Sequence, residues 1–160
     1  MPGEGILGNM MNALTQDLIK RSGGLLTVQP EINDWTGKNY QMMNTGSIEI
    51  EVGEFLYGLV RVLKPQYILD TGTHFGVSAA YMAQGLFDND LEGHVFSLEH
   101  DIYFHQKSQD LWNNLGLFSF ITGIHGKSLD YVPSREYDLI LLDTEPDLRF
   151  NELVMFYPYL

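Results

Sequence analysis

Residues 67–78 read YILDTGTHFGVS, and this stretch decides which fold the rest of the chain can adopt. Its first residues, Tyr67-Ile68-Leu69, form an apolar run that is short enough for a strand buried on both faces. Asp70-Thr71-Gly72 ends this run. Gly72 and Gly76 lack a Cβ atom, so the turn between them can be tight and its backbone can approach a ligand closely. The stretch predicts a strand, a turn that contacts a ligand, and the start of a helix.

Helical and strand patterns alternate on both sides of this turn. Apolar residues recur at helical spacing from Val52 to Leu63, and Pro65 ends that helix. Strands that alternate with helices indicate βαβ units, so we predict an α/β fold, a Rossmann-like parallel sheet with four recognisable strands and helices on both faces. The other predicted elements are helices over 78–86, 102–115 (stopped by Gly116) and 149–157, and strands over 94–98, 118–124 and 137–142.

The glycine spacing at the first strand end limits the kind of ligand. A dinucleotide-binding turn has the spacing G-x-G-x-x-G, whereas this turn has G-x-x-x-G. Asp70 would repel a pyrophosphate but suits a ligand with a positively charged amino-acid head. Glu99 ends the second strand, where a carboxylate can accept two hydrogen bonds from ribose hydroxyls. The sequence therefore favours a nucleoside that carries a cationic amino-acid group, and it disfavours the alternative of a nucleotide-binding oxidoreductase domain.

The motif Asp70-x-Gly72-x-x-x-Gly76-x-Ser78, together with Glu99, resembles the class I S-adenosylmethionine-dependent methyltransferases. It is most similar to the small-molecule O-methyltransferases of the catechol type, from about Glu51 to Asp143. The resemblance implies S-adenosylmethionine-dependent methyl transfer to a small-molecule acceptor, at a hydroxyl oxygen. The cofactor-binding residues that it implies are Val52, Gly53, Asp70, Gly72, Thr73, His74, Gly76, Ser78, Glu99, His100, Lys127, Ser128 and Asp143.

The acceptor side departs from this family. Asp143 matches an acid that binds magnesium in metal-dependent members, and it is our candidate catalytic residue. Magnesium is thus a second candidate cofactor, although one acid cannot make a tight site. Pro146 stands where catechol-type enzymes have a lysine base, and Lys127 stands where many members have an acid. The chain ends at Leu160, before the family's fifth strand, so an incomplete or truncated protein that binds the cofactor without methylating anything is an alternative.

The first 46 residues are predicted to form an N-terminal helix and a lid-like segment, and residues 47–160 the S-adenosylmethionine-binding domain. The helix is expected over Met10–Arg21, ended by Gly23-Gly24. Leu25–Tyr40 shows little periodicity, so we expect a loop or lid there. Trp35, Tyr40, Met42 and Met43 could form an apolar lid over a substrate, but aromatic and methionine side chains more often pack into the core.

The composition excludes several function classes. The chain has a formal net charge of −12, which disfavours binding to nucleic acids and anionic membranes. It has no cysteine, and no apolar run approaches the length of a membrane span, so we expect a cytoplasmic protein. The histidines lack the spacing of a metal site and are expected to be loop residues, with a proton-transfer role as the alternative for His74 and His125. A homo-oligomer could form through an exposed sheet edge.

Overall fold

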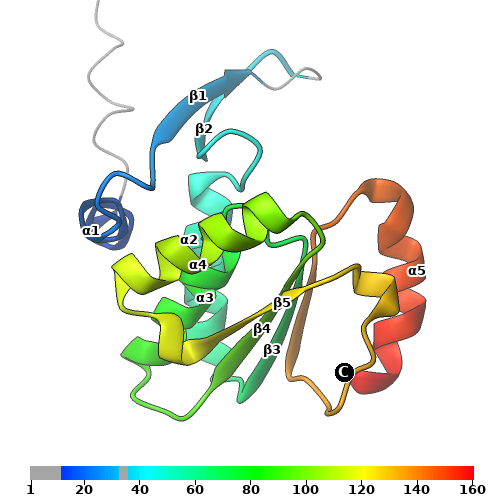
Figure 1. The fold of residues 1–160 in the computed structure, drawn as a ribbon. Helices are drawn as coiled ribbons and strands as arrows, with labels where there is room; N and C mark the ends of the chain where they lie inside the picture. The colour runs from blue at the N-terminus through cyan, green and yellow to red at the C-terminus, as the bar shows by residue number, and fades with distance from the viewer. Residues whose placement is uncertain (1–11, 33–35) are drawn as a thin grey trace, which may run out of the picture.

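The computed structural model describes residues 12–32 and 36–160 and confirms the predicted α/β fold (Figure 1). A four-stranded parallel sheet has the strand order β5–β4–β3–β6. None of the described helices is long and apolar enough to cross a membrane. The strands of the sheet are β3 (Tyr67–Thr71), β4 (His94–Glu99), β5 (Ile121–His125) and β6 (Leu139–Leu142), and the helices are α1 (Ala13–Arg21), α2 (Ile50–Leu63), α3 (Val77–Asp88), α4 (Ile102–Leu115) and α5 (Pro146–Phe156).

The order of the strands reverses at β3. The chain runs outward from β3 to β4 and β5, and then returns to place β6 on the other side of β3. Strand β3 is consequently central, and Ile68–Thr71 are all buried. In open α/β sheets, ligands bind at the carboxyl ends of the strands near this reversal. The fold thus predicts a ligand-binding site near the carboxyl ends of β3 and β6.

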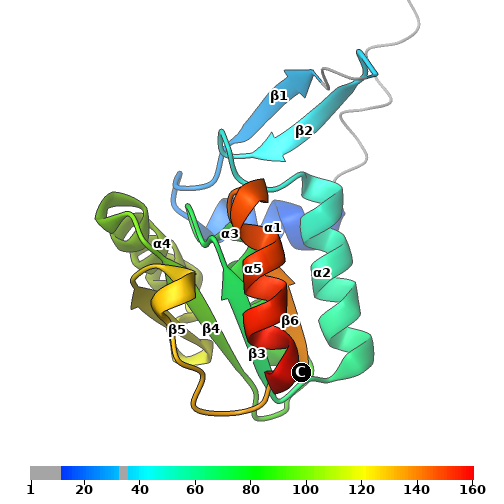
Figure 2. The ribbon, with the colours of Figure 1, turned by 90° about the vertical axis from the view of Figure 1, so that its right-hand side faces the viewer.

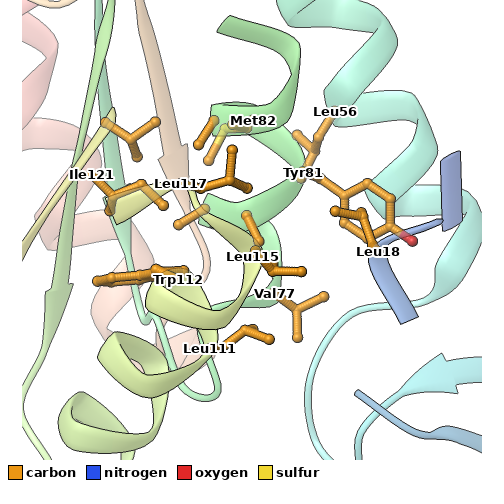
Figure 3. Packing of buried hydrophobic residues seen from close by; sticks show 14 of the residues in the cluster. Leu18, Leu56, Val77, Tyr81, Met82, Leu111, Trp112, Leu115, Leu117 and Ile121 are labelled. Atoms are coloured by element: carbon orange, nitrogen blue, oxygen red, sulfur yellow. The ribbon is translucent and has the colours of Figure 1, made fainter. Parts of the chain in front are cut away.

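Helices α1 to α4 lie on one face of the sheet and enclose the larger hydrophobic core (Figures 1 and 3). Helix α3 is buried on almost its entire surface, which explains why its sequence lacks a polar stripe. Figure 3 shows Trp112 of α4 and Tyr81 of α3 among the largest side chains of this core. The indole N–H of Trp112 donates a hydrogen bond of 2.9 Å to the carbonyl oxygen of Gly76. The hydrophobic core therefore contacts, through this hydrogen bond, the turn between Gly72 and Gly76 that is predicted to bind a ligand.

Helix α5 covers the opposite face, as Figure 2 shows. A smaller hydrophobic cluster lies beneath it, formed by Leu69, Leu98, Tyr137 and Phe156. Because Leu69 and Leu98 come from β3 and β4, this cluster fixes α5 against the middle of the sheet. Helices therefore cover both faces of the sheet, as the alternation of elements predicts.

Several element boundaries differ from the predicted ones. The apolar run at Phe118–Phe120 forms a 3-10 turn, and β5 begins only at Ile121. Tyr137 and Asp138 precede β6, and the Asp138 carboxylate accepts hydrogen bonds from the backbone N–H groups of Gln66 and Tyr67. Helix α5 begins at Pro146, three residues before the predicted start. Apolar composition indicated where strands lie, but it did not determine where backbone pairing starts.

The predicted loop over Leu25–Tyr40 is wrong in part. Strand β1 (Val28–Ile32) pairs antiparallel with β2 (Asn39–Met43), and the hairpin stands apart from the main sheet (Figure 1). Most residues of both strands are partly buried or exposed, so the strands carry no clear apolar alternation that could have predicted them.

The predicted lid residues have different environments. Met43 is fully buried in the same core cluster as Leu18 and Val77, while Tyr40 and Met42 are partly buried. Trp35 lies outside the described residues, as does Met10, where the N-terminal helix was expected to begin. The helix α1 and the base of the hairpin therefore share one hydrophobic core with the sheet.

Backbone contact between the ends of β3 and β6 requires glycine at position 72. Gly72 has a φ of +79°, and a Cβ atom there would overlap the carbonyl group of Asp143. Its N–H donates to the carbonyl oxygen of Leu98 at 3.1 Å. Gly116, the stop residue of α4, offers a matched comparison, because its φ is +71° and a Cβ atom there would meet no other group within 4 Å.

We therefore expect Gly72→Ala to lower the free energy of unfolding much more than Gly116→Ala. The exposed Gly116 site should lose about 1–2 kcal/mol, the ordinary cost of a left-handed alanine. Gly72→Ala should lose about 3 kcal/mol or more, because backbone has to move as well. Urea denaturation of both variants measures the difference. Equal losses would show that the contact between residue 72 and Asp143 is not a constraint.

Candidate functional site

A cleft of about 980 Å³ lies at the carboxyl ends of the strands, which is within the usual size of a small-molecule site. The end of β4 and the segments that directly follow β3, β5 and β6 form its walls, and the segment Gly46–Ile48, between β2 and α2, closes one side. The structure thus brings together residues that lie far apart in the sequence. The predicted site residues that line the cleft are Gly72, Thr73, His74, Ser78, Glu99, His100, Lys127, Ser128 and Asp143.

The other predicted site residues do not line the cleft. Gly76 begins α3, where a Cβ atom would lie 2.7 Å from the Trp112 indole nitrogen. Gly53 packs against Tyr81, and a Cβ atom there would overlap the tyrosine ring. Val52, on the same helix, is 40% exposed. Gly76 and Gly53 therefore allow close packing behind the cleft, while Asp70 is completely buried beneath its floor.

Glu99 is the most firmly held polar group of the cleft. Its carboxylate oxygens accept backbone hydrogen bonds from His74 at 2.7 Å and from Asp101 at 2.8 Å. Glu99 is only 5% exposed, so its carboxylate is held in place by these hydrogen bonds and contacts little solvent. A carboxylate has about four acceptor positions, and those not used by the two N–H groups remain for the hydroxyl groups of a ligand. His100 Nδ1 lies 3.3 Å from the same carboxylate but is largely exposed.

His74 forms an aromatic wall beside Glu99. Its ring lies 3.9 Å from the ring of Phe104, at 34°, and contacts the edge of Phe75. Burial lowers the pKa of His74, although Glu99 and Asp101 act in the opposite direction. The ring is therefore neutral near pH 7. Sequence analysis missed Phe104, which lies in the first turn of α4, directly after the second strand end.

Asp143 directly follows β6 and forms an ion pair that the sequence pattern does not predict. Arg149 Nη2 lies 3.0 Å from Asp143 Oδ1, and Arg149 Nε donates to the carbonyl oxygen of Thr144 at 2.8 Å. Burial raises the pKa of Asp143, and the guanidinium opposes this rise. Arg149 was expected as the first residue of the helix. Because α5 begins at Pro146, Arg149 instead completes the first turn, where its guanidinium contacts Thr144 and Asp143.

A buried glutamate on α5 is hydrogen-bonded to the residues at the ends of β3 and β6. Glu152 of α5 is 0% exposed. One of its carboxylate oxygens accepts hydrogen bonds from Thr144 at 2.7 Å and from Thr71 at 3.3 Å. The strand ends that flank Gly72 and Asp143 are thereby joined through one carboxylate. This arrangement limits how far the β6 wall of the cleft can move.

Asp70 lies under the ligand turn in a network of hydroxyl groups. Ser97 donates a hydrogen bond of 2.6 Å to Asp70, and Ser78 donates to both of its oxygens at 3.2–3.3 Å. Thr73 is hydrogen-bonded to Ser97 in turn. Burial raises the pKa of Asp70 to about 7, and the serine hydrogen bonds offset part of that rise. Ser97, opposite Asp70 in the β3–β4 register, was missed, although it is the serine within an otherwise largely apolar strand.

A family model described as "Methyltransferase domain" matches residues 69–157, which is more than half of the chain. The chain belongs to this methyltransferase-domain family. The match begins within β3 and ends just after α5, so it includes all the strand ends that form the cleft. No curated protein matches the sequence.

Solved O-methyltransferases share the fold of this methyltransferase domain. The Bacillus cereus O-methyltransferase in complex with SAH has a TM-score of 0.66 and 18% identity over 93% of the chain. TomG from Streptomyces achromogenes, an O-methyltransferase of tomaymycin synthesis in complex with SAM, has a TM-score of 0.63 and 18% identity over 71%. A SAM-dependent O-methyltransferase from Thermotoga maritima has a TM-score of 0.60 and 16% identity over 80%. The chain spans 64%, 52% and 52% of these structures, respectively.

These findings confirm the methyltransferase family that the resemblance predicts, and the solved O-methyltransferases confirm its fold. These findings do not support a magnesium site. Within residues 12–32 and 36–160, no three histidine, aspartate or glutamate side chains are grouped so that they could hold a metal ion. Asp143 is paired with Arg149, and hard cations need several oxygen ligands. The described part of this methyltransferase domain therefore does not by itself fit a magnesium ion.

The buried acid of the domain should make stability depend on pH. Between about pH 4 and pH 7, the folded state keeps a proton on Asp70 that the unfolded state has released. The contribution of Asp70 to the free energy of unfolding should fall as the pH rises through this window and then level off. Asp70→Asn removes this contribution, so the variant should gain stability relative to the wild type between pH 5 and pH 8.

Urea denaturation across this pH range tests the expectation. Asp110→Asn, at an exposed position on α4, is the control and should follow the wild-type curve. Parallel curves for Asp70→Asn and the wild type would show that Asp70 does not titrate in this window.

Proposed function

We propose that the cleft binds S-adenosylmethionine and that the domain transfers the methyl group to a small-molecule acceptor, at a hydroxyl oxygen. The observation that carries this proposal is the buried carboxylate of Glu99, held by two backbone N–H groups beside the Gly72 turn. Such a carboxylate suits a neutral ribose and disfavours a phosphate. Family membership supports the same cofactor, because the family is one of methyltransferases.

Each strand end has a role in this proposal. Glu99 accepts hydrogen bonds from the ribose hydroxyls, and the backbone near Gly72 and Thr73 lies along the methionine part. Ser78 lines the cleft and also donates to Asp70, so it links the amino-acid end of the cofactor to the buried acid. The adenine lies between the ends of β4 and β5. The residues proposed to flank it are His100, Lys127 and Ser128, with His74 and Phe104 as the adjacent aromatic wall.

The proposed reaction is a displacement at the methyl carbon. The acceptor oxygen forms a bond to that carbon while the carbon–sulfur bond breaks, and the electron pair stays on sulfur, which leaves S-adenosylhomocysteine. The acceptor loses its hydroxyl proton. Alignment of donor and acceptor can supply about 7–11 kcal/mol of the barrier reduction, so strong acid–base catalysis is not required. Asp143 is the candidate group on the acceptor side, where its raised pKa suits the acceptance of a proton.

A second function, cofactor binding without methyl transfer, is favoured by one observation. Asp143 is already engaged by Arg149, and Pro146 occupies the position where the resembling enzymes have a lysine base. The two functions differ in turnover but not in cofactor affinity. Incubation with S-adenosylmethionine and a panel of hydroxylated acceptors, followed by detection of S-adenosylhomocysteine, distinguishes them.

Cofactor binding itself is tested by substitution of Glu99. We expect Glu99→Gln to weaken the binding of S-adenosylhomocysteine about 10- to 100-fold, because charge-assisted hydrogen bonds to the ribose are lost. Calorimetry measures the affinity. Glu92→Gln is the matched control, because this exposed glutamate precedes β4, at the opposite end of the sheet. Binding of NAD in place of the adenosyl ligands would refute the proposal, as would equal affinities for wild type and Glu99→Gln.

A further inference from the structure

Arg149 is a cationic side chain on the β6 wall of the cleft, and it has donors to spare. The first turn of α5 places it there, with its side chain 46% exposed. A guanidinium has five N–H donors. The contacts with described residues use Nε, which donates to Thr144, and Nη2, which donates to Asp143. The remaining N–H groups are available to a ligand in the cleft.

The surroundings of Arg149 limit what that ligand can be. Leu148 and Leu129 give this part of the cleft apolar surface, which suits a ring or an alkyl group. Asp130 and Glu145 also line the cleft, and both are exposed and acidic. These two acids therefore repel an anionic group on the acceptor, whereas the Arg149 guanidinium attracts it.

The cofactor and the acceptor occupy different walls of the cleft. In the proposed function, the ends of β3, β4 and β5 hold the cofactor, so the β6 wall with Arg149 is left for the acceptor. On this wall the Arg149 guanidinium lies beside Asp143, with Nη2 at 3.0 Å from Oδ1. A planar guanidinium matches the two oxygens of a carboxylate, which it can bind through parallel hydrogen bonds.

We propose that Arg149 is a specificity-determining residue, which binds the carboxylate of a hydroxylated aromatic or apolar acid as the methyl acceptor. This proposal rests on the proposed function, because it assigns the acceptor of the same cleft. The carboxylate is an anchor and does not react. It holds the ring so that a hydroxyl group, and not the acid, faces the methyl group.

The test compares two probes on the chain saturated with S-adenosylhomocysteine. Calorimetry measures the affinity for 3,4-dihydroxybenzoate and for catechol, which lacks the carboxylate. We expect the wild type to bind the acid about tenfold or more tightly than catechol, and Arg149→Gln to abolish that preference. Arg149→Lys should keep part of it, because a lysine provides the charge without the planar pair of donors. Affinity for S-adenosylhomocysteine should be the same in all variants.

Two controls separate direct binding from other effects. Arg61→Gln removes an arginine from α2 that lies near Asp88, away from the cleft, and should leave the preference intact. The double variant Asp143→Asn/Arg149→Gln also replaces the Asp143 carboxylate, which has no cationic partner once Arg149 is gone, with a neutral amide. The preference for 3,4-dihydroxybenzoate over catechol should stay lost in this variant. Recovery of the preference in this double variant would overturn the proposal, since repulsion by Asp143 would then explain the single variant.

Other outcomes are equally decisive. A wild type without preference for the acid, or an Arg149→Gln variant that keeps it, overturns the role of Arg149 while cofactor binding stands. Loss of S-adenosylhomocysteine affinity in Arg149→Gln would place Arg149 at the cofactor and overturn the proposal as well. Failure of the wild type to bind S-adenosylhomocysteine refutes the proposed function itself, so the two failures are distinguishable.

Discussion

The backbone at the end of β3 touches the backbone at the end of β6, and the cleft depends on this contact. A residue with a side chain at position 72 would push the two strand ends apart, because its Cβ atom would overlap the carbonyl group of Asp143. Once the two strand ends meet, Asp143 and Arg149 lie across the same cleft from Glu99. The reversal of strand order at β3 brings the walls together, and the glycine lets them approach closely enough to form one site.

Buried acids support this contact on both sides of β3. Asp70 accepts hydrogen bonds from the hydroxyl groups of Ser78 and Ser97. Glu152 accepts hydrogen bonds from the hydroxyl groups of Thr71 and Thr144. Each carboxylate is fully buried, so the loss of one hydroxyl partner would leave a polar group with fewer hydrogen bonds and no water to replace it. The floor of the cleft is thus built from polar groups whose positions depend on one another, which favours a rigid, preformed site.

Local physical rules explain what could be predicted from the sequence. The α4 helix ends where Gly116 adopts a left-handed conformation, and the buried strands appear as short apolar runs, so the order of elements and most strand ends followed from the pattern. The hairpin was missed because its pairing is a matter of backbone and leaves no apolar alternation. Ser97 and Arg149 acquire their roles only through strand register and the exact start of α5. The Ser97 contact joins distant segments, and the Arg149 contact depends on the exact geometry of one helical turn, so local composition encodes neither.

The hydrogen bond from Trp112 to Gly76 also makes Trp112 an intrinsic fluorescent probe of the turn. The chain contains two tryptophans, Trp35 and Trp112, so replacing Trp35 leaves the buried indole as the single strong emitter. That indole N–H is bonded to the carbonyl at the start of α3, directly behind the turn that faces the cleft. The emission wavelength of the indole depends on this hydrogen bond and on how completely water is excluded from its surroundings. Fluorescence therefore reports the state of the turn without any attached label.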